Sequence, residues 1–430
     1  MSEHTAVQIL FVTNEFVWPA ERGGRVRSLS QLRLLASLPE VERIRLFTLR
    51  EDHVPEEHRA ELARQVGKLD VLEPVFHPIH LFAHKRYVPR VAWLRVAQGV
   101  PYLAGKWDAP AVRSALQREL QGRRFDVVWL EHLGTARYLG LVRRLQPGAR
   151  VVLDQQNVDS DIWGQFARRQ RGLRRLIAES EWRAARRFER DTLRAVDAVS
   201  AISLDDARAY RDFAGVDAVT IPQVVPFVRR PLSHQPGPRL AYVGNLTWHP
   251  NSRGLEWFFA AVWPLVRERL PDVTLDVAGS GLPHDAGGAP LAPRTWGQPG
   301  VTVLGFVPDL TPLYERSVAL VAPILGGSGV RIKLLEAFRS GVPVVTTPDG
   351  AAGLPIQAGR EAFVESEPQA FAARLFEIAS SSELRSRLRE AAYSFLERHH
   401  GLATAQTRAR ALLGCGSRPG REIEPLLTTA

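Results

Sequence analysis

The chain contains 430 residues with a formal net charge of +10, and 45% of its residues are hydrophobic. This length is more than one hydrophobic core normally accommodates, so it predicts two or three domains. The chain has no run of about 18 or more apolar residues, which argues against a membrane-spanning helix. Its only cysteine, Cys415, excludes an intrachain disulfide and a multi-cysteine metal site.

The start of the chain and the placement of its charge bear on location and partners. MSEHTAVQILFVT carries acidic and polar residues ahead of a short apolar strand, unlike a secretory signal or an Arg-rich transit peptide, so we expect a cytoplasmic protein. Nearly all of the positive surplus falls within residues 1–230, which favours anionic partners such as lipid headgroups, phosphorylated substrates or nucleic acid. Lysine is rare among the basic residues, which draws notice to Lys333.

Residues 1–230 alternate between strand and helix patterns. A glycine loop, RGG at 22–24, separates the first apolar run from the first helical one, as at the start of a doubly wound α/β domain. Helical periodicity is found at 25–38, 56–67 and 110–121. Apolar runs predict buried parallel strands at 7–13, 44–49, 125–132, 150–158 (with its exit loop), 197–203 and 218–222.

A second α/β segment follows a proline-rich interval at 224–239, which we interpret as an interdomain linker. An amphipathic helix is predicted at 252–271. Strands are predicted at 240–246, 273–281, 301–307, 318–323 and 342–347. The fold class is therefore α/β, with two Rossmann-like, doubly wound domains. We expect the domains to span 1–230 and 231–395, with a C-terminal helix at 396–415 and a disordered tail at 416–430.

The stretch GGSGVRIKLLEAFRSGVPVVTT, residues 326–347, concentrates the candidate chemistry. It follows a predicted strand, and ligands of open parallel sheets sit at the carboxyl ends of strands. Its glycines let the backbone approach a ligand, and the following helix aims free N–H groups at it, which suits phosphate. Arg331 and Lys333 would neutralise a diphosphate, and the Glu336 carboxylate would accept hydrogen bonds from ribose hydroxyls. The stretch predicts a sugar-nucleotide site; the alternative is a solvated helix with surface charges.

This combination resembles the donor motif of the retaining GT-B glycosyltransferases of the family 4 type, the glycosyl transferases group 1. Their usual motif is a Glu, seven residues, a second Glu and then a small-Gly-x-Pro-Val-Val turn. Glu336 matches the second Glu and SGVPVV matches the turn, whereas Ser328 stands where the first Glu would fall. The chain is similar to a variant in which Gly-x-Arg-x-Lys precedes a single Glu. The first Glu normally contacts the donor sugar, so the resemblance leaves the identity of the sugar open.

The resemblance extends over most of the chain. FVTNEFVWPAERGGRVRS resembles the family's first strand and glycine loop, DVVWLEHLG a strand with a histidine near the donor sugar, and DQQNVDSDIW an acceptor-side loop. YVGNLTWHPN resembles the opening of the second domain, where Asn245 and either Asn251 or Arg253 replace the usual Arg and Lys, and GFVPDLTPLYERS resembles the base-side loop. The resemblance implies an acceptor contact from Asn157. It implies donor contacts from Gly23, Gly24, Gly244, Asn245, Phe306, Val307, Gly327, Ser328, Gly329, Val330, Arg331, Lys333 and Glu336.

The resemblance also implies an architecture and a mechanism. In the GT-B architecture two Rossmann-like domains face each other across a cleft, and the C-terminal helix returns to the N-terminal domain. A nucleotide sugar would bind the C-terminal domain and a glycan or lipid-linked acceptor the N-terminal one, with retention of configuration and without a metal or other cofactor. The implied setting is cell-surface polysaccharide or glycoconjugate assembly.

His132, Lys333 and Glu336 are the residues that we expect to be catalytic. His132 would stabilise positive charge or bind a sugar hydroxyl, and Lys333 would stabilise the departing diphosphate. Two of the proposed site residues, His132 and the acceptor-side Asn157, also have a structural alternative. His132 at a strand end is equally consistent with a buried, hydrogen-bonded histidine, and Asn157 with a turn former.

Residues 167–194 form an Arg-rich segment that predicts one basic amphipathic helix. The basic and aromatic run at 84–96 adds to this feature. One interpretation is contact with an anionic membrane at the inner face, where a lipid-linked acceptor would be presented. The alternative is a solvated helix whose apolar stripe packs on its own domain. The stripe consists of Leu173, Leu176, Ile177, Ala184 and Phe188.

Four other classes of protein are alternatives to the glycosyltransferase interpretation. A nucleotide-sugar 2-epimerase shares the architecture but lacks the KLLEAFRSGVPVV pattern, and a dehydrogenase is disfavoured because no G-x-G-x-x-G follows the first strand. The positive charge alone would fit a nucleic-acid-binding protein, but no binding motif is present, so we expect no nucleic-acid partner. A nucleotide-sugar-binding protein that has lost catalysis stays open, because Ser328 replaces the expected Glu.

Overall fold

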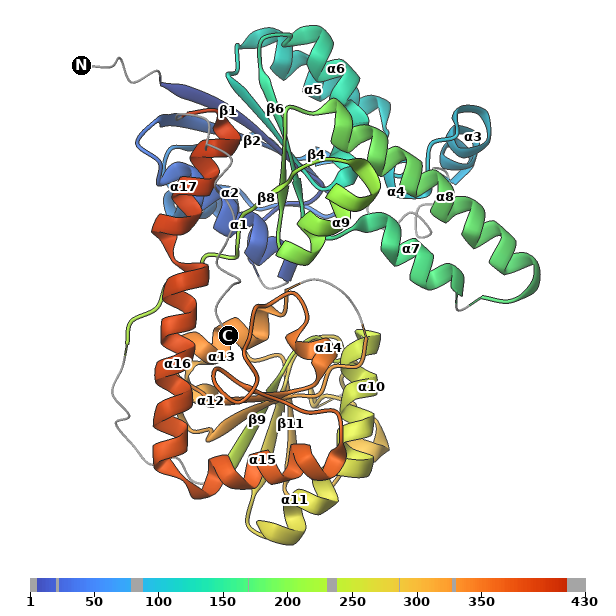
Figure 1. The fold of residues 1–430 in the computed structure, drawn as a ribbon. Helices are drawn as coiled ribbons and strands as arrows, with labels where there is room; N and C mark the ends of the chain where they lie inside the picture. Colours follow the sequence, from blue (N-terminus) through green and yellow to red (C-terminus); the bar gives the residue numbers. More distant parts are fainter. Residues whose placement is uncertain are drawn as a thin grey trace. The chain divides into compact units, whose positions relative to one another are not determined.

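A computed structural model of the chain describes residues 6–20, 23–78, 88–168, 170–229, 238–285, 287–326 and 330–415. The chain divides after Gln223 and again after Leu402 into two compact units (Figure 1). Unit 1 contains the described residues before the first division and after the second, and unit 2 contains those between the two. The predicted tail at 416–430 and part of the predicted linker lie outside the described residues.

Unit 1 is built on a parallel sheet with the strand order β3-β2-β1-β5-β6-β7-β8, and β4 also pairs with β2. β1 lies inside the sheet, where Leu10 is opposite Arg45 of β2 and Val128 of β5. The strands are β1 (Val7–Thr13), β2 (Val41–Arg50), β3 (Leu69–Val71), β4 (Val75–Phe76), β5 (Val127–Glu131), β6 (Arg150–Gln155), β7 (Ala198–Ala201) and β8 (Val219–Thr220). The helices are α1 (Gly23–Ala36), α2 (Glu56–Val66), α3 (Val88–Gln98), α4 (Tyr102–Gly105), α5 (Pro110–Gly122), the 3₁₀ helix η2 (Leu133–Tyr138), α6 (Leu139–Leu145), α7 (Asp159–Arg168), α8 (Gly172–Ala195), α9 (Leu204–Ala214) and α17 (Leu402–Leu413).

Unit 2 is built on a parallel sheet with the order β11-β10-β9-β12-β13-β14. Successive residues of β9 point to opposite faces of the sheet, so Tyr242 belongs to one hydrophobic cluster and Ala241 to another. Helices therefore cover both faces of the sheet. The strands are β9 (Arg239–Val243), β10 (Thr274–Ala278), β11 (Val301–Gly305), β12 (Ala319–Ala322), β13 (Val344–Thr346) and β14 (Phe363–Val364). The helices are α10 (His249–Trp257), the π-helical η3 (Phe258–Val262), α11 (Trp263–Arg269), the 3₁₀ helix η4 (Arg294–Trp296), α12 (Thr311–Glu315), α13 (Ile332–Arg339), α14 (Pro348–Ala351), α15 (Pro368–Ser380) and α16 (Ser382–His400).

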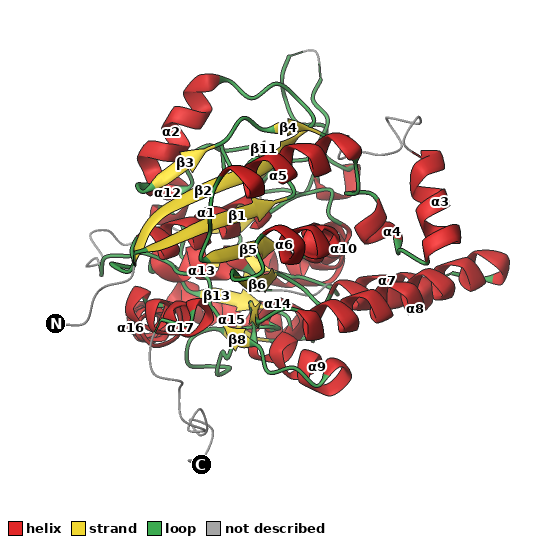
Figure 2. Ribbon diagram, turned by 90° about the horizontal axis from the view of Figure 1, so that it is seen from above, coloured by secondary structure: helices red, strands yellow, loops and turns green. Residues whose placement is uncertain are grey.

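Both sheets confirm the predicted pair of doubly wound α/β units, because the strand order of each sheet reverses beside its first strand. The reversal lies between β1 and β5 in unit 1 and between β9 and β12 in unit 2. Two predicted helices differ from the structure. The helix at 252–271 contains a π-helical turn between α10 and α11. The single helix expected at 167–194 is wrong, because α7 ends at Arg168 and α8 begins at Gly172, whose φ of 56° reverses the chain. Figure 2 shows the resulting α7–α8 hairpin extending from the sheet. Among the described residues, no helix is long and apolar enough to cross a membrane.

The C-terminal helix α17 belongs to unit 1, as the predicted architecture requires. The Arg410 Nε atom donates a 2.7 Å hydrogen bond to Glu40, and the Gln406 side chain donates one of 2.9 Å to Ser37 Oγ. The carbonyl oxygen of Leu412 accepts a hydrogen bond from the Arg150 side chain of β6. These contacts connect the end of the chain to elements that lie near its beginning.

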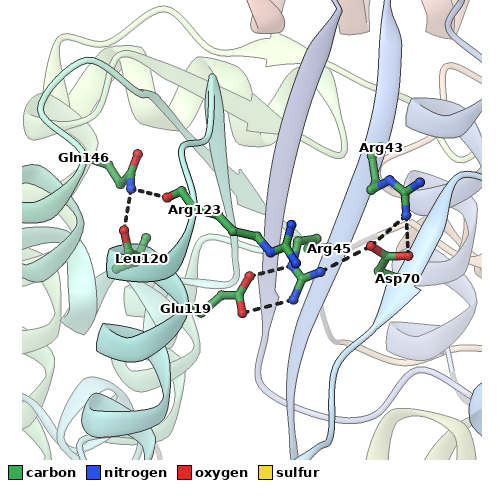
Figure 3. A network of polar contacts seen from close by, with 7 residues as sticks. All are labelled: Arg43, Arg45, Asp70, Glu119, Leu120, Arg123 and Gln146. Carbon is green, nitrogen blue, oxygen red and sulfur yellow. Dashed lines mark hydrogen bonds and ion pairs between the residues drawn. The ribbon is translucent and has the colours of Figure 1, made fainter.

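A polar network fixes α5 and β3 to β2 in unit 1 (Figure 3). Arg45 of β2 pairs with Glu119 of α5 on one side and with Asp70 of β3 on the other, and Arg43 donates to the same aspartate. The hydrogen bond with Glu119 raises the pKa of the Arg45 guanidinium. The Gln146 amide group donates to the carbonyl oxygens of Leu120 and Arg123, and it thereby satisfies acceptors that the C-terminus of α5 leaves free.

In unit 2, α10 lies directly against the loop that leaves β12. A Cβ atom added at Gly254 of α10 would lie 1.3 Å from the carbonyl oxygen of Pro323, which is far inside van der Waals contact. The carbonyl oxygen of Pro250 in the same helix accepts a hydrogen bond from Leu325 N. Only glycine permits this approach, which brings the first turn of α10 beside the segment that follows β12.

Replacing Gly254 by alanine should therefore destabilise unit 2. Alanine is a better helix former than glycine by about 1 kcal/mol, but the added methyl group must displace backbone. We expect a net loss of at least about 2 kcal/mol in the free energy of unfolding, measured by urea denaturation. The control is Gly140→Ala in helix α6, where no atom lies within 4 Å of the added Cβ. An equal effect of the two substitutions would contradict the proposed close packing.

Candidate functional site

A candidate site in unit 2 lies where β9 and β12 are neighbours in the sheet although they are not consecutive in the chain. Strand order reverses at this position, and ligands of doubly wound sheets bind outside the carboxyl ends of the strands there. β9 ends at Val243 and leads into the segment Gly244–Trp248, and β12 leads towards helix α13. The predicted residues Lys333 and Glu336 both lie on α13.

Lys333 is the centre of this site. Its Nζ atom lies 3.0 Å from the Asn251 side-chain oxygen and 3.4 Å from the Tyr242 hydroxyl, and both distances allow it to donate a hydrogen bond. The same ammonium lies 4.7 Å from the centroid of the Tyr242 ring, which gives a cation–π contact. The Lys333 ammonium of α13 therefore contacts both strand β9, through Tyr242, and helix α10, through Asn251.

Burial sets the protonation of this amine and of its neighbour on the helix. Desolvation, with a smaller contribution from the positive charge of Arg331, lowers the pKa of Lys333 to about 7. Burial raises the pKa of Glu336, which lies one turn further along α13 and whose carboxyl group makes no hydrogen bond with any described residue. A bound anion would favour the charged form of Lys333, because it would replace the water that burial removes.

Gly244 and two asparagines shape the wall of the site opposite α13. A Cβ atom at Gly244 would lie 2.5 Å from Lys333 Nζ, so this glycine is required for the ammonium to occupy its position. Asn245 accepts hydrogen bonds from Thr247 N and Trp248 N in a turn that starts α10. The Asn251 amide nitrogen donates to the Asn245 carbonyl oxygen at 2.7 Å, which aims the side-chain oxygen of Asn251 at Lys333.

Arg331 is placed differently from Lys333. Its side chain is only 6% exposed, and burial lowers its pKa. Its guanidinium donates to the carbonyl oxygens of Gly326 and Asp349, and it stacks 5.2 Å from the centroid of the Trp248 ring. Asp349 also accepts a hydrogen bond from Gly326 N at 2.6 Å. Arg331 therefore connects Gly326 to the start of α14 while its charge remains beside Lys333.

The remaining donor-side predictions are distributed over both units. Phe306 is exposed, whereas Val307 and Val330 pack partly against the hydrophobic cluster that contains Ala241. Gly23 and Gly24 begin helix α1 in unit 1. The predictions for Gly327, Ser328 and Gly329 concern positions outside the described residues.

Unit 1 contains a cavity of about 790 Å³ at the carboxyl ends of its central strands. Its wall includes Glu15, Arg25, Lys106, Trp107 and His132. His132 follows β5 with a φ of 68°, a left-handed conformation that is uncommon for a residue with a side chain. This turn places the imidazole of His132 in the wall of the cavity.

A buried charge pair lies beside His132. Desolvation lowers the pKa of Lys106, and it raises the pKa of Asp159, while each charge acts against the shift of the other. The Lys106 ammonium lies 4.4 Å from the centroid of the Trp107 ring. Asp159 begins α7, and the carboxylate of Glu189 in α8 accepts hydrogen bonds from Asp159 N and Ser160 N. This contact fixes the N-terminus of α7 at the cavity.

Asn157 lies between β6 and α7 but is not among the described residues that line the cavity. Its carbonyl oxygen accepts a hydrogen bond from Tyr210. Sequence reasoning missed Tyr242, Trp248, Lys106 and Asp159, which lie near strand or helix ends and carry no motif of their own. A signal existed for Lys106, because lysine is rare in this chain. Among the described residues no group of three or more His, Cys, Asp or Glu side chains is arranged to hold a metal ion.

Comparison with known proteins places this geometry in a family context. Residues 237–381 match the family described as Glycosyl transferases group 1. An uncharacterized 44.6 kDa protein in the cps region of Klebsiella pneumoniae is 25% identical over 161 residues, which are 37% of this chain and 42% of that protein. The match thus spans less than half of the length of this relative.

Solved structures resemble the chain over almost its whole length. The HepE protein of Anabaena, in complex with UDP and glucose, has a TM-score of 0.61 at 13% identity and covers 95% of this chain and 99% of its own. A mutant of TarM from S. aureus, in complex with Fondaparinux, alpha-GlcNAc-glycerol and UDP, has a TM-score of 0.64 at 10% identity, with 95% and 99% covered. A glycosyltransferase from Rickettsia africae has a TM-score of 0.61 at 12% identity, with 95% and 98% covered. The chain has the GT-B fold.

The lowered pKa of Lys333 predicts a specific pH dependence of stability. Between pH 7 and 10.5 the unfolded chain holds a proton that the folded amine has released, so this group makes the free energy of unfolding rise with pH by up to about 1.4 kcal/mol per unit. We expect that Lys333→Met removes this rise and that its stability relative to the native chain is greatest below pH 7. Urea denaturation at several pH values measures both slopes. Parallel curves for the two proteins would show that Lys333 titrates normally.

Proposed function

We propose that the protein is a glycosyltransferase that moves a sugar from a nucleotide-sugar donor to the hydroxyl group of an acceptor. The observation that carries this proposal is the Lys333 site, with its buried amine, two polar partners and a glycine wall at the carboxyl ends of β9 and β12. The site lies within the segment that matches the glycosyl transferases group 1 family. HepE and TarM, which share the fold, were solved with UDP.

The donor would bind to unit 2 through its diphosphate. Lys333 would supply a positive charge that becomes fully protonated when the anion enters, and the N-terminus of α13 would add free N–H groups. Arg331 would contribute its charge from a fixed position, since its guanidinium is hydrogen-bonded to the carbonyl oxygens of Gly326 and Asp349. The Glu336 carboxyl group, which has no hydrogen-bond partner among the described residues, could accept hydrogen bonds from sugar or ribose hydroxyls.

The transfer exchanges one bond at the anomeric carbon for another. The bond from this carbon to the diphosphate oxygen breaks, and the acceptor oxygen forms the new bond while its proton passes to the departing phosphate oxygen. The nucleoside diphosphate departs with the electron pair, and Lys333 and Arg331 stabilise the negative charge that develops on it. Retention of configuration, without a nucleophile from the protein, is the outcome that the family resemblance supports.

The acceptor would bind in the cavity of unit 1. His132, Lys106 and Asp159 provide polar groups of both charges in its wall. We propose a glycan or a lipid-linked sugar as the acceptor, made on the cytoplasmic side for cell-surface polysaccharide or glycoconjugate. The relative in a cps region supports this role.

A nucleotide-sugar-binding protein without transferase activity is the second candidate function. It is favoured by one observation, Ser328 in place of the Glu that normally contacts the donor sugar. The two candidates differ in turnover. Incubation of the native protein with a panel of nucleotide sugars would release nucleoside diphosphate if it is a transferase, through transfer or slow hydrolysis, and would show only binding otherwise.

Removing the donor-side charges should abolish transfer without unfolding the protein. We expect Lys333→Ala and Glu336→Ala each to reduce kcat roughly 10²–10³-fold, because each removes a group that acts on developing charge. Lys333→Ala should also weaken UDP binding, as measured by isothermal titration calorimetry. The control is Arg294→Ala, which removes an exposed charge from the same unit. Native turnover in either active-site variant would remove this site from the proposal.

His132→Ala should separate the acceptor side from the donor side. If His132 acts in the unit 1 cavity, its loss reduces transfer at least about tenfold while the affinity for UDP stays native. The matched control is His284→Ala at an exposed position of unit 2. The assay compares kcat/KM for the acceptor with the Kd for UDP in the same preparation. Unchanged transfer would assign His132 a structural role only.

A further inference from the structure

The α7–α8 hairpin of unit 1 exposes apolar side chains at its tip. Leu173, Leu176 and Ile177 of α8 are 72%, 64% and 62% exposed, and Phe166 of α7 is also exposed. The predicted apolar stripe therefore behaves differently at its two ends. Phe188 packs against buried residues of its own unit, whereas the three residues near Gly172 contact solvent. Large apolar side chains grouped in this way indicate a surface that binds a partner.

Helix α3 lies beside this surface. Arg95 of α3 donates hydrogen bonds to the carbonyl oxygen and the hydroxyl of Ser180 in α8. Ser180 lies one helical turn from Leu176 and Ile177 on the same face, so α3 is held beside the exposed end of the stripe. Figures 1 and 2 both show α3 next to the α7–α8 hairpin. The hairpin patch, as defined here, consists of Phe166, Leu173, Leu176 and Ile177, all of them exposed.

Positive charge surrounds the hairpin patch. Arg168, Arg171 and Arg174 are exposed and form no ion pair with any described residue. The nearby acids are already paired, Glu179 with two arginines of α8 and Glu181 with Arg95. The patch therefore has free cations beside its apolar residues and no free carboxylate among the described residues of the α8 tip.

We propose that the hairpin patch docks unit 1 onto the surface of a lipid bilayer rich in anionic headgroups. Aliphatic and aromatic side chains would enter the boundary between headgroups and acyl chains, and the arginines would pair with lipid phosphates. The combination of apolar side chains with arginines fits a membrane better than a nucleic acid. A nucleic acid would pair with the arginines but would leave Leu173, Leu176 and Ile177 without an apolar partner. A lipid bilayer is therefore the partner that we propose for the patch.

The position of the patch also explains how a lipid-linked acceptor would reach its site, an extension that rests on the proposed function. Ile162 and Trp163 of α7 line the unit 1 cavity, and Phe166 follows them by one turn. The rings of Trp163 and Phe166 contact each other edge to face at 5.9 Å. One helix therefore carries residues from the cavity wall to the docking surface, so that a headgroup sugar would enter the cavity from the membrane side.

Vesicle flotation of the full chain tests the docking without any nucleotide or sugar, so its outcome is independent of transferase activity. We expect binding to vesicles of phosphatidylcholine with phosphatidylglycerol, little binding to phosphatidylcholine alone, and release at high salt. The variants L173S/L176S/I177S and R171E/R174E should each bind at least roughly tenfold more weakly. Native UDP affinity and thermal midpoint would show that these variants remain folded.

Matched controls remove the same chemistry elsewhere in the chain. L204S/L291S/L402S replaces three exposed leucines outside the patch, and R118E/R124E reverses two exposed arginines that have no ion pair with a described residue. Both controls should float like the native protein. The proposal is overturned if the native chain fails to bind at low salt, if binding survives both patch variants, or if the controls lose binding equally. Binding to RNA but not to vesicles would instead assign the charge to a nucleic-acid partner.

Discussion

An amine kept largely out of water is the constraint on which the unit 2 site depends. Lys333 and Tyr242 are 91 positions apart in the chain, and they meet because β9 and β12 are neighbours in the sheet. Removing a charged amine from water is unfavourable, and one tyrosine hydroxyl and one amide oxygen compensate only in part. The site therefore favours a bound anion, whose charge would stabilise the protonated form of Lys333. Strongly shifted pKa values of this kind are typical of functional positions.

Glycine at three positions makes this arrangement possible. Gly244 leaves room for the ammonium, Gly254 lets α10 approach the exit of β12, and a Cβ at Gly279 would lie 1.6 Å from the carbonyl oxygen of Gly244. In each case backbone or charge occupies the volume that a side chain would need. Precise placement of Asn251 against Lys333 follows from this packing, because Asn251 lies on the same turn of α10 as Gly254.

The fold was largely predictable, because apolar strands separated by amphipathic helices leave a strong pattern in the sequence. Lys333 and Glu336 could be proposed as site residues for a similar reason, since they lie in one short glycine-rich stretch. Tyr242 could not, because nothing in the strand sequence RLAYV indicates that its tyrosine meets a lysine of another element. The hydrogen bonds of Arg331 to backbone carbonyls were equally hidden, as was the break at Gly172, where helical periodicity continues across a reversal of the chain.

The return of α17 to unit 1 makes unit 2 an insertion within unit 1. Translation runs from the N-terminus, so Glu40 and Arg150 leave the ribosome long before Arg410 and Leu412, the residues of α17 that they contact. Unit 2 can complete its core while unit 1 is still missing a helix. Unit 1 therefore lacks one of its helices until residues 402–413 have been synthesised, and this delay follows from the order of the segments along the chain.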